Sequence, residues 1–327
     1  MPVVCHESQS VELVEGQSVL DALLAQGGLI PYSCRGGICQ SCLMRAVEGQ
    51  PPPAAQAGLR ETLRLQNYFL ACVCHPTENL KVTLPSAEGL AVHTTVVGHR
   101  RLGDEIIELS LMPEAPLAYR AGQFITLFNS EAGQGRSYSL ASVPGLDASL
   151  ILHVRRLPGG RISGWIHEEL RVGQTVEVRG PGGDCFYVPG KPEQGLLLIG
   201  TGSGLAPLYG ILRDALAQGH QGPIRLFHGS RDPGGLYLVN ELRELACRHA
   251  QFDYVPCLSG PDPALGYAQG RAHEVALGEF SDLKGWRVFL CGHPDMVQQA
   301  QMRAYLAGAA LQEIHADAFH TRREPPH

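Results

Sequence analysis

Charged residues are few in this chain of 327 residues, and positively charged ones are the fewer. Asp, Glu, Lys and Arg make up 18% of the sequence, with 26 basic against 32 acidic residues and a formal net charge of −6. Hydrophobic residues account for 44%, which excludes an intrinsically disordered chain. Because no run of basic residues offsets the acidic balance, we expect no nucleic-acid partner.

Segments that direct a protein to a membrane are also lacking. Residues 1–18 contain no positively charged start followed by an apolar run, so we expect no signal peptide. The uncharged stretch 195–212 contains glycines and a proline, which predicts a strand–loop–helix passage rather than a membrane helix. We therefore expect a cytoplasmic protein without a membrane partner. Its ten cysteines then indicate metal or redox chemistry rather than disulfides.

Four of these cysteines have a distinctive spacing. Cys34-x4-Cys39-x2-Cys42, followed by Cys72 after 29 intervening residues, is the plant-type [2Fe–2S] pattern. The loop includes Gly36 and Gly37, whose small size allows the backbone to approach a cluster. A zinc site and unligated core cysteines are the alternatives. Structural zinc favours two short cysteine pairs, so the spacing favours iron.

The hydrophobic pattern predicts three domains, at residues 1–88, 89–190 and 191–327. The three prolines at 51–53 are not read as a linker, because Cys72 must return to the cysteine site. Between 92 and 188, short β-rich runs alternate with turn signals, which predicts an antiparallel barrel with one helix near 162–170. After residue 195, strand and helix patterns alternate, which predicts a doubly wound parallel sheet. The fold class is therefore a multidomain combination of α+β and α/β.

Residues 1 to about 85 resemble a plant-type ferredoxin domain of β-grasp fold, and Leu70-Ala71-Cys72 matches that family's fourth-ligand motif. The resemblance implies that Cys34, Cys39, Cys42 and Cys72 bind a [2Fe–2S] cluster. Gln40 departs from the pattern, since Gly or Ala usually follows the second cysteine.

The sequence R-S-Y-S at 136–139 resembles the R-x-Y-S motif of the ferredoxin–NADP reductase superfamily. Tyr138 can stack on a flavin ring, the Ser139 hydroxyl can bond near its N5, and Arg136 can neutralise a pyrophosphate. G-G-R-I-S at 159–163 opens the barrel's helix, where amide N–H groups suit an anion. H-V-R at 153–155 occupies the strand that, in relatives, lines the flavin mainly through its backbone. Taken alone, R-S-Y-S is only a strand edge.

Two further motifs resemble the nucleotide half of that superfamily. G-T-G-S-G-L-A-P at 200–207 matches its G-T-G-x-x-x-x-P motif, although it does not satisfy G-x-G-x-x-G. C-G-H-P-D-M at 291–296 resembles C-G-x-P-x-M, whose cysteine lies near the nicotinamide C4. A buried thiol at the end of a strand is the alternative for Cys291. Relatives often end near an aromatic residue that covers the flavin, and Phe319 is the candidate here.

The adenosine end of the nucleotide determines the choice between NADH and NADPH. Arg231 follows a predicted strand and favours a 2′-phosphate, as do Ser259 and Arg271. Asp232 and Asp262 would repel that dianion. We therefore predict a preference for NADH.

The resemblance covers nearly the whole chain, and its domain order is that of the reductase components of bacterial multicomponent oxygenases. It implies a ferredoxin–NAD(+) reductase type of enzyme, in which electrons pass from NADH to FAD, to [2Fe–2S] and then to an oxygenase or hydroxylase component or an intermediary ferredoxin. A reductase for an iron–sulfur deoxysugar dehydratase is an alternative, and a non-catalytic metal-binding scaffold is a more distant one.

Tyr138, Ser139 and Cys291 are the predicted catalytic residues. The predicted cofactor-binding residues are Arg136, Ser137, Tyr138, Ser139, His153, Val154, Arg155, Gly159, Gly160, Arg161, Ile162, Ser163, Gly200, Thr201, Gly202, Ser203, Gly204, Pro207, Arg231, Cys291, Gly292, Pro294, Met296 and Phe319.

Overall fold

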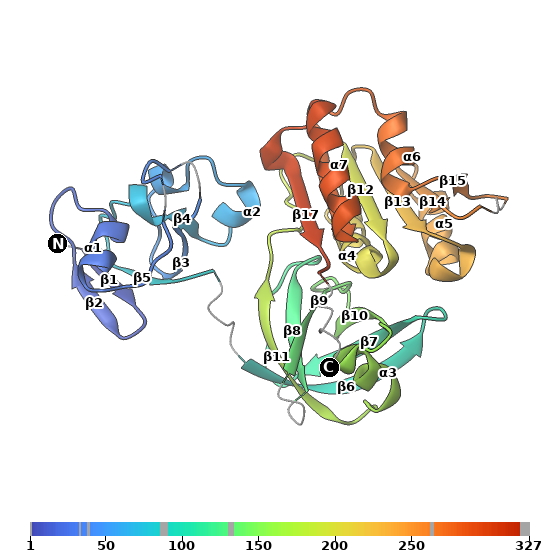
Figure 1. Ribbon diagram of the computed structural model, residues 1–327, viewed down its shortest axis with the longest axis horizontal. Helices are drawn as coiled ribbons and strands as arrows, with labels where there is room; N and C mark the ends of the chain where they lie inside the picture. The colour runs from blue at the N-terminus through green and yellow to red at the C-terminus, as the bar shows by residue number, and fades with distance from the viewer. Residues whose placement is uncertain are drawn as a thin grey trace. The chain divides into compact units, whose positions relative to one another are not determined.

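The computed structural model describes residues 2–32, 34–37, 40–85, 91–129, 134–261 and 265–320. Contacts within the chain divide it into two compact units, Met1–Glu88 and Gly89–His327 (Figure 1). The predicted boundary between residues 88 and 89 lies outside the described residues. The boundary predicted between 190 and 191 falls within the second unit and stays a prediction. Within the described part of the chain, no helix is long and apolar enough to cross a membrane.

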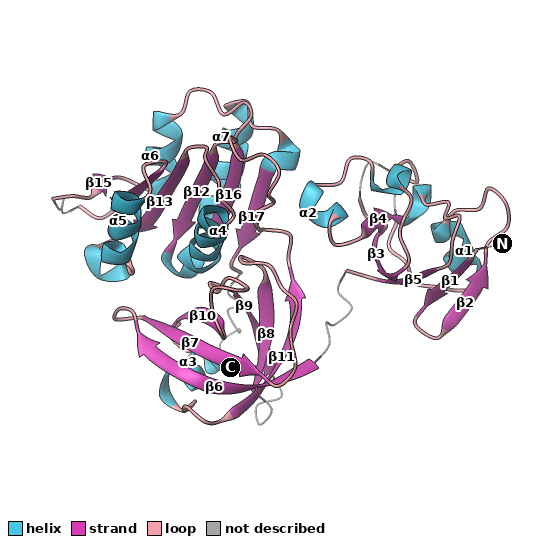
Figure 2. Cartoon of the chain, turned by 180° about the vertical axis from the view of Figure 1, so that it is seen from behind, coloured by secondary structure: helices cyan, strands magenta, loops and turns pink. Residues whose placement is uncertain are grey.

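The first unit is built on a five-stranded mixed sheet in the order β2-β1-β5-β3-β4 (Figure 2). β1 and β5 run parallel, and the other neighbouring strands run antiparallel. The strands are β1 (Val3–His6), β2 (Gln9–Glu12), β3 (Leu43–Glu48), β4 (Tyr68–Leu70) and β5 (Leu80–Thr83), and the helices are α1 (Val19–Ala25) and α2 (Glu61–Arg64).

Helix α1 covers the core of this unit. Ser18 caps it, because the Ser18 hydroxyl accepts a hydrogen bond of 3.1 Å from the Asp21 amide. Leu20 and Leu23 on its inner face are fully buried against the sheet. The short 3₁₀ helix Pro53–Gln56 buries Ala55 in the same core, so the run of prolines lies inside this unit.

The second unit begins with a six-stranded antiparallel sheet in the order β10-β7-β6-β11-β8-β9. A bridge between Leu140 and Leu152 joins its two ends, which closes the sheet into a barrel. Ile125 and Leu127 alternate with outward residues along β8 and fill the barrel's core. The elements are β6 (Ala91–Arg101), β7 (Ile106–Pro113), β8 (Phe124–Asn129), β9 (Gln134–Ser139), β10 (Leu150–Arg155), α3 (Arg161–Glu168) and β11 (Thr175–Gly182).

A six-stranded parallel sheet follows in the order β15-β14-β13-β12-β16-β17. Alternate residues of β12 pack on opposite faces: Leu196 and Leu198 join the core under α4 and α5, whereas Leu197 and Ile199 join the one under α6 and α7. The strands are β12 (Leu196–Thr201), β13 (Ile224–Ser230), β14 (Phe252–Leu258), β15 (Ala268–Gln269), β16 (Arg287–Gly292) and β17 (Ile314–Ala318). The helices are α4 (Leu205–Ala217), α5 (Val239–Arg248), α6 (Ala272–Glu279) and α7 (Pro294–Leu306).

This arrangement confirms the predicted barrel and doubly wound sheet. It also positions a binding site. β12 lies between β13, which follows it in the chain, and β16, so the strand order changes direction at β12. Ligands of doubly wound sheets bind at such a switch point, beyond the carboxyl ends of the strands.

Candidate functional site

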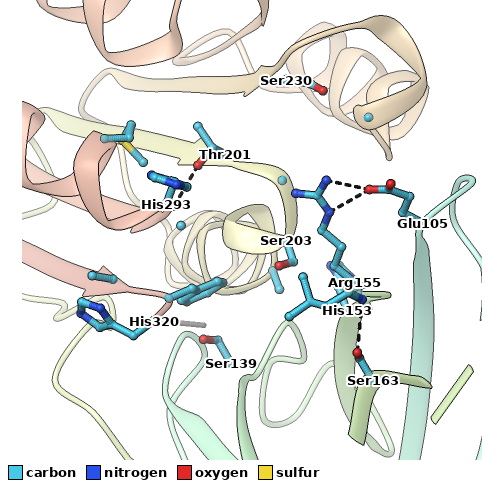
Figure 3. Close-up of a pocket in the computed structure, with 18 of the residues that line it drawn as sticks. Glu105, Ser139, His153, Arg155, Ser163, Thr201, Ser203, Ser230, His293 and His320 are labelled. Atoms are coloured by element: carbon cyan, nitrogen blue, oxygen red, sulfur yellow. Dashed lines mark hydrogen bonds and ion pairs between the residues drawn. The ribbon is translucent and has the colours of Figure 1, made fainter. Parts of the chain in front are cut away.

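A cavity of about 1060 Å³ lies where the barrel meets the carboxyl ends of the parallel strands (Figure 3). Ligand pockets usually measure about 300–1,000 Å³, so this one is large enough for more than one small group. Ser139, His153 and Ser163 line it from the barrel, and Thr201 and Ser203 line it from the loop after β12. The cavity therefore brings the two sets of predicted motifs together. The predicted residues that line it are Arg136, Ser137, Tyr138, Ser139, His153, Arg155, Gly159, Gly160, Arg161, Ile162, Ser163, Thr201, Gly202, Ser203, Arg231, Gly292, Met296 and Phe319.

The barrel side of the cavity is suited to a flavin. Tyr138 at the end of β9 is half-buried, and burial raises the pKa of its phenol, so the ring stays neutral at physiological pH. The neighbouring Ser139 is buried, and its hydroxyl donates to Asp317 Oδ2 over 3.1 Å. Arg136 remains exposed and faces the same cavity. An aromatic ring, a hydroxyl and a cation thus lie in a row along one strand edge.

The N-terminus of α3 forms the anion-binding part of this wall. A Cβ at Gly160 would lie 2.4 Å from Ser163 Oγ, so only glycine fits there. Ser163 Oγ accepts a hydrogen bond of 3.2 Å from the Leu157 amide and donates one of 3.3 Å to the Gly160 carbonyl. These contacts tighten the turn that presents the first amides of the helix to the cavity, which fits a pyrophosphate.

The opposite wall is a glycine loop that packs closely against the end of β16. Gly202 has a φ of +54° and begins the 3₁₀ turn Gly202–Gly204. A Cβ at Gly204 would lie 2.3 Å from the Cys291 carbonyl, and one at Gly292 would lie 2.5 Å from Thr201 Oγ1. Glycines therefore let the ends of β12 and β16 come together. The open cradle that results fits a dinucleotide phosphate.

The cysteine loop lies in the first unit. Cys34 is exposed and accepts a hydrogen bond of 3.4 Å from the Gly36 amide to its Sγ, a contact typical of cluster thiolates. Cys42 is buried, and burial together with the neighbouring Cys72 raises its pKa to about 11. Cys39 lies outside the described residues, which by themselves contain no group of three candidate metal ligands. The neighbouring thiols of Cys42 and Cys72 and the amide donor to Cys34 fit an iron–sulfur cluster.

Gln40 has a φ of +58°, in the left-handed region that favours glycine. Its side chain is exposed. This conformation suits glycine, one of the two residues that usually follow the second cysteine in the family that the sequence resembles.

Comparisons with known proteins agree with this geometry. The chain matches the 2Fe-2S iron-sulfur cluster binding domain over residues 3–77, the oxidoreductase FAD-binding domain over 94–187 and the oxidoreductase NAD-binding domain over 198–302. It is 34% identical to the aromatic O-demethylase reductase subunit of Amycolatopsis, over 94% of this chain and 96% of that one. The chain belongs to the family of oxygenase reductase components.

Other relatives also align over nearly the whole chain. The naphthalene 1,2-dioxygenase ferredoxin–NAD(P)(+) reductase component of Pseudomonas putida is 31% identical, over 93% of this chain and 94% of that one. The crystal structure of the Amycolatopsis cytochrome P450 reductase GcoB superposes with a TM-score of 0.69 at 31% identity, covering 98% of this chain and 99% of that one. In this reductase, electrons therefore pass from NADH to FAD and to [2Fe–2S].

Several predicted residues of the reductase do not line the cavity, and the reason is close packing. Val154 points into the barrel core, and Cys291 is fully buried, with its Sγ 3.8 Å from Cys185 Sγ. Burial and the neighbouring thiol raise the pKa of Cys291 well above its ordinary value, so the group is a neutral thiol behind the lining. Its role next to the nicotinamide stays a prediction. The residues outside the lining are Val154, Gly200, Gly204, Pro207, Cys291 and Pro294.

The reductase also has lining residues that no motif predicted. Asp317 is two residues before Phe319 and could have been suspected from that proximity alone. Glu105 carries no sequence signal, yet its Oε2 lies 2.7 and 2.8 Å from two nitrogens of Arg155. Further lining residues of this kind are Asp104, Phe124, Gln134, Leu157, Gly229, Ser230, Gly234, Gly235, Ala272, His273, Ala318 and His320. The lining also includes Ala206, His293 and Asp295 from within the quoted motifs, and Asp232, Ser259 and Arg271 from the predicted adenosine end.

The adenosine end of the cavity contains both signs of charge. Arg231 and Asp232 are exposed next to each other after β13, and Ser259 and Arg271 line the same cavity. Asp262 lies outside the described residues. The structure brings the predicted cations and one of the two predicted acids to one place.

Proposed function

We propose that this reductase prefers NADH and passes electrons from its own [2Fe–2S] cluster directly to an oxygenase component that acts on an aromatic substrate. The shared cavity is the observation that supports the proposal. It places the R-S-Y-S strand beside the loops after β12 and β16, so that a flavin and a nicotinamide can meet in one enclosed space. The family relatives named above serve an O-demethylase and a dioxygenase.

When bound, FAD accepts a hydride and releases its two electrons singly. The chain's residues supply positions and charges for that chemistry. Ser139 Oγ, at the end of β9, offers a hydroxyl whose orientation is set by Asp317. The Phe319 amide donates a hydrogen bond of 2.8 Å to the Gly292 carbonyl, and the residue lines the same cavity, where its ring would shield the bound groups from water. The α3 N-terminus and the Gly202 loop would hold the pyrophosphates of FAD and of the nicotinamide nucleotide.

Arg155 is suited to hold the nicotinamide nucleotide from the barrel side. A Cβ at Gly202 would lie 3.4 Å from Arg155 Nη1, so the guanidinium faces the nucleotide loop. Its bonds to Glu105 keep it extended across the cavity. Because a pyrophosphate carries more charge than one carboxylate, it competes for Arg155 with Glu105.

The preference for NADH rests on Asp232 beside Arg231. An acid at this position favours the ribose 2′-hydroxyl and repels a 2′-phosphate. The test is kcat/KM for each nucleotide with ferricyanide as acceptor. A higher value with NADH supports the proposal, and a clear advantage for NADPH makes Arg231 and Arg271 a phosphate clamp. Asp232→Asn should narrow the difference in kcat/KM between NADH and NADPH.

Reconstitution identifies the acceptor. The purified reductase is mixed with aromatic oxygenase components of the cytochrome P450, Rieske and di-iron types, and product formation is measured with and without an added ferredoxin. Turnover without the ferredoxin supports direct transfer. A strict requirement for it favours the second candidate, an intermediary ferredoxin, as the name of the naphthalene relative suggests.

A further inference from the structure

Three buried rings join the barrel to the parallel sheet at the wall of the cavity; one of them lines the cavity and the other two do not. His153 is on β10, His228 is on β13, and Tyr237 precedes α5. The Tyr237 ring lies edge-on to both imidazoles, with centroid distances of 5.2 Å to His153 and 5.5 Å to His228. Tyr237 Oη is also 3.1 Å from His153 Nδ1. The sequence motifs account for His153 alone and leave His228 and Tyr237 unexplained.

His228 has a defined hydrogen bond within it. Its Nε2 lies 3.2 Å from the Gly202 carbonyl oxygen. Since a carbonyl can only accept, Nε2 must carry the hydrogen, and Nδ1 keeps a lone pair that has no hydrogen-bond partner in the described structure. Burial lowers the pKa of His228 to about 4, so the imidazole is neutral at physiological pH.

The Gly202 carbonyl accepts hydrogen bonds from His228 Nε2 and from the Leu205 amide, and together these bonds set the direction of a peptide group that faces the cavity. In a trans peptide the C=O and the following N–H point in opposite directions. With the Gly202 carbonyl directed inward to His228, the Ser203 N–H is directed away from it, and both Gly202 and Ser203 line the cavity. Gly202 has a left-handed φ of +54°, which favours glycine at this position.

We propose that His228 is a positioning residue for the nicotinamide nucleotide, which holds the Gly202–Ser203 peptide so that its N–H faces the bound phosphate, while Tyr237 and His153 hold His228 in place. The inference rests on the proposed use of NADH and deepens it. We expect no direct contact between His228 and the nucleotide. His228 is fully buried and does not line the cavity, whereas its neighbour Gly229 does.

The chain contains a matched pair for comparison. His220 and Tyr187 form a second buried His–Tyr contact, with Nδ1 3.2 Å from the phenol oxygen and rings 5.6 Å apart at 90°. His220 Nε2 lacks a hydrogen-bond partner, as His153 Nε2 does, among the described residues. Neither His220 nor Tyr187 lines the cavity. Substitution at His220 therefore reproduces the loss of a buried imidazole without touching the nucleotide loop.

The experiment compares His228→Met, His228→Gln and His220→Met in the full-length protein loaded with FAD. NAD⁺ binding is titrated through the flavin absorbance, and KM for NADH is measured with ferricyanide. We expect His228→Met to raise both the Kd for NAD⁺ and the KM for NADH about tenfold, which corresponds to about 1.4 kcal/mol. His228→Gln retains an N–H donor and should stay within about threefold of the wild type. His220→Met should leave both values unchanged.

Two outcomes overturn the proposal: unchanged NAD⁺ binding in His228→Met, or equal weakening in His220→Met. If His228→Met does not retain FAD, His228→Asn takes its place, because the shorter amide cannot reach Gly202 and should give the same tenfold loss. Failure of the proposed function is distinguishable, since the wild type itself would then show a higher kcat/KM for NADPH than for NADH.

Discussion

Ser139 in the barrel donates a hydrogen bond of 3.1 Å to Asp317 at the end of β17, although 178 residues separate them in the sequence. The bond connects the strand edge that faces the flavin site with the edge strand of the parallel sheet. Burial raises the pKa of Asp317, and the bond from Ser139 offsets only part of that shift. Asp317 thus carries its charge at a cost in folding free energy.

This pKa gives a prediction for Asp317→Asn. A carboxyl whose pKa is raised in the folded state stabilises the protein below its unfolded pKa, and that stability is lost as the pH rises through the folded value. Asparagine keeps an acceptor for Ser139 and cannot ionise. We therefore expect the Tm of the variant to exceed that of the wild type by more at pH 8 than at pH 5. A constant difference across this range would contradict the raised pKa.

The cluster ligands are tested with two cysteines of one sequence triplet. Cys72→Ser should lose the iron, about two atoms per chain, whereas Cys74→Ser should retain it, because Cys74 is fully buried in the core. Because the FAD and nucleotide cavity lies in the other unit, Cys72→Ser should still reduce ferricyanide with NADH. Iron analysis and ferricyanide assays measure these results. If Cys72→Ser retained iron and Cys74→Ser lost it, Cys74 would be the fourth cluster ligand and Cys72 would not.

Cys291 and Cys185 separate a role in hydride transfer from a role in packing. We expect Cys291→Ala to keep FAD and nucleotide binding but to slow flavin reduction by NADH about tenfold, because its strand end supports Gly204 and Gly292. Cys185→Ala removes the other thiol of the same contact and should not slow it. Stopped-flow absorbance measures both rates. Equal slowing in the two variants would return Cys291 to a packing role.

The ion pair between Arg287 and Glu313 gives a stability prediction. Arg287 Nε lies 2.6 Å from Glu313 Oε2, and its side chain is only 2% exposed. Arg287→Met leaves a partly buried carboxylate and should cost about 3–5 kcal/mol in free energy of unfolding at pH 7. Lys191 contacts the same Glu313 at 3.0 Å but is half-exposed, so Lys191→Met should cost less than about 1 kcal/mol. Urea denaturation of the wild type and of both variants measures these differences in the free energy of unfolding.

The effect of Arg287→Met should also depend on pH. Burial alone would raise the pKa of Glu313, but the bonds and charges of Arg287 and Lys191 outweigh it and lower the pKa. Stability from a lowered carboxyl pKa is present above the unfolded value and is lost as the pH falls through the folded value. The difference between wild type and Arg287→Met should therefore shrink below pH 4.5. A difference that grows in acid would contradict this assignment.

The sequence by itself determined the domain types and the loops. The spacing of Cys34, Cys42 and Cys72 and the glycines of G-G-R-I-S and G-T-G-S-G reflect requirements of the local backbone. A tight turn, a positive φ or a close approach can be met only by particular residues in consecutive positions. Such requirements can be read without knowing what packs nearby.

Tertiary structure alone decided which side chains meet across the cavity. Asp317 reaches Ser139, and Cys185 covers the Cys291 thiol, only because the barrel packs against the carboxyl ends of β12 and β16. Glu105 holds Arg155 because β7 and β10 pair within the barrel. The sequence shows only that His228 lies near the end of a strand, and its hydrogen bond to the Gly202 carbonyl becomes evident only in the folded structure. These contacts join residues far apart in the chain, and their distances depend on how whole strands pack, which no short stretch of sequence specifies.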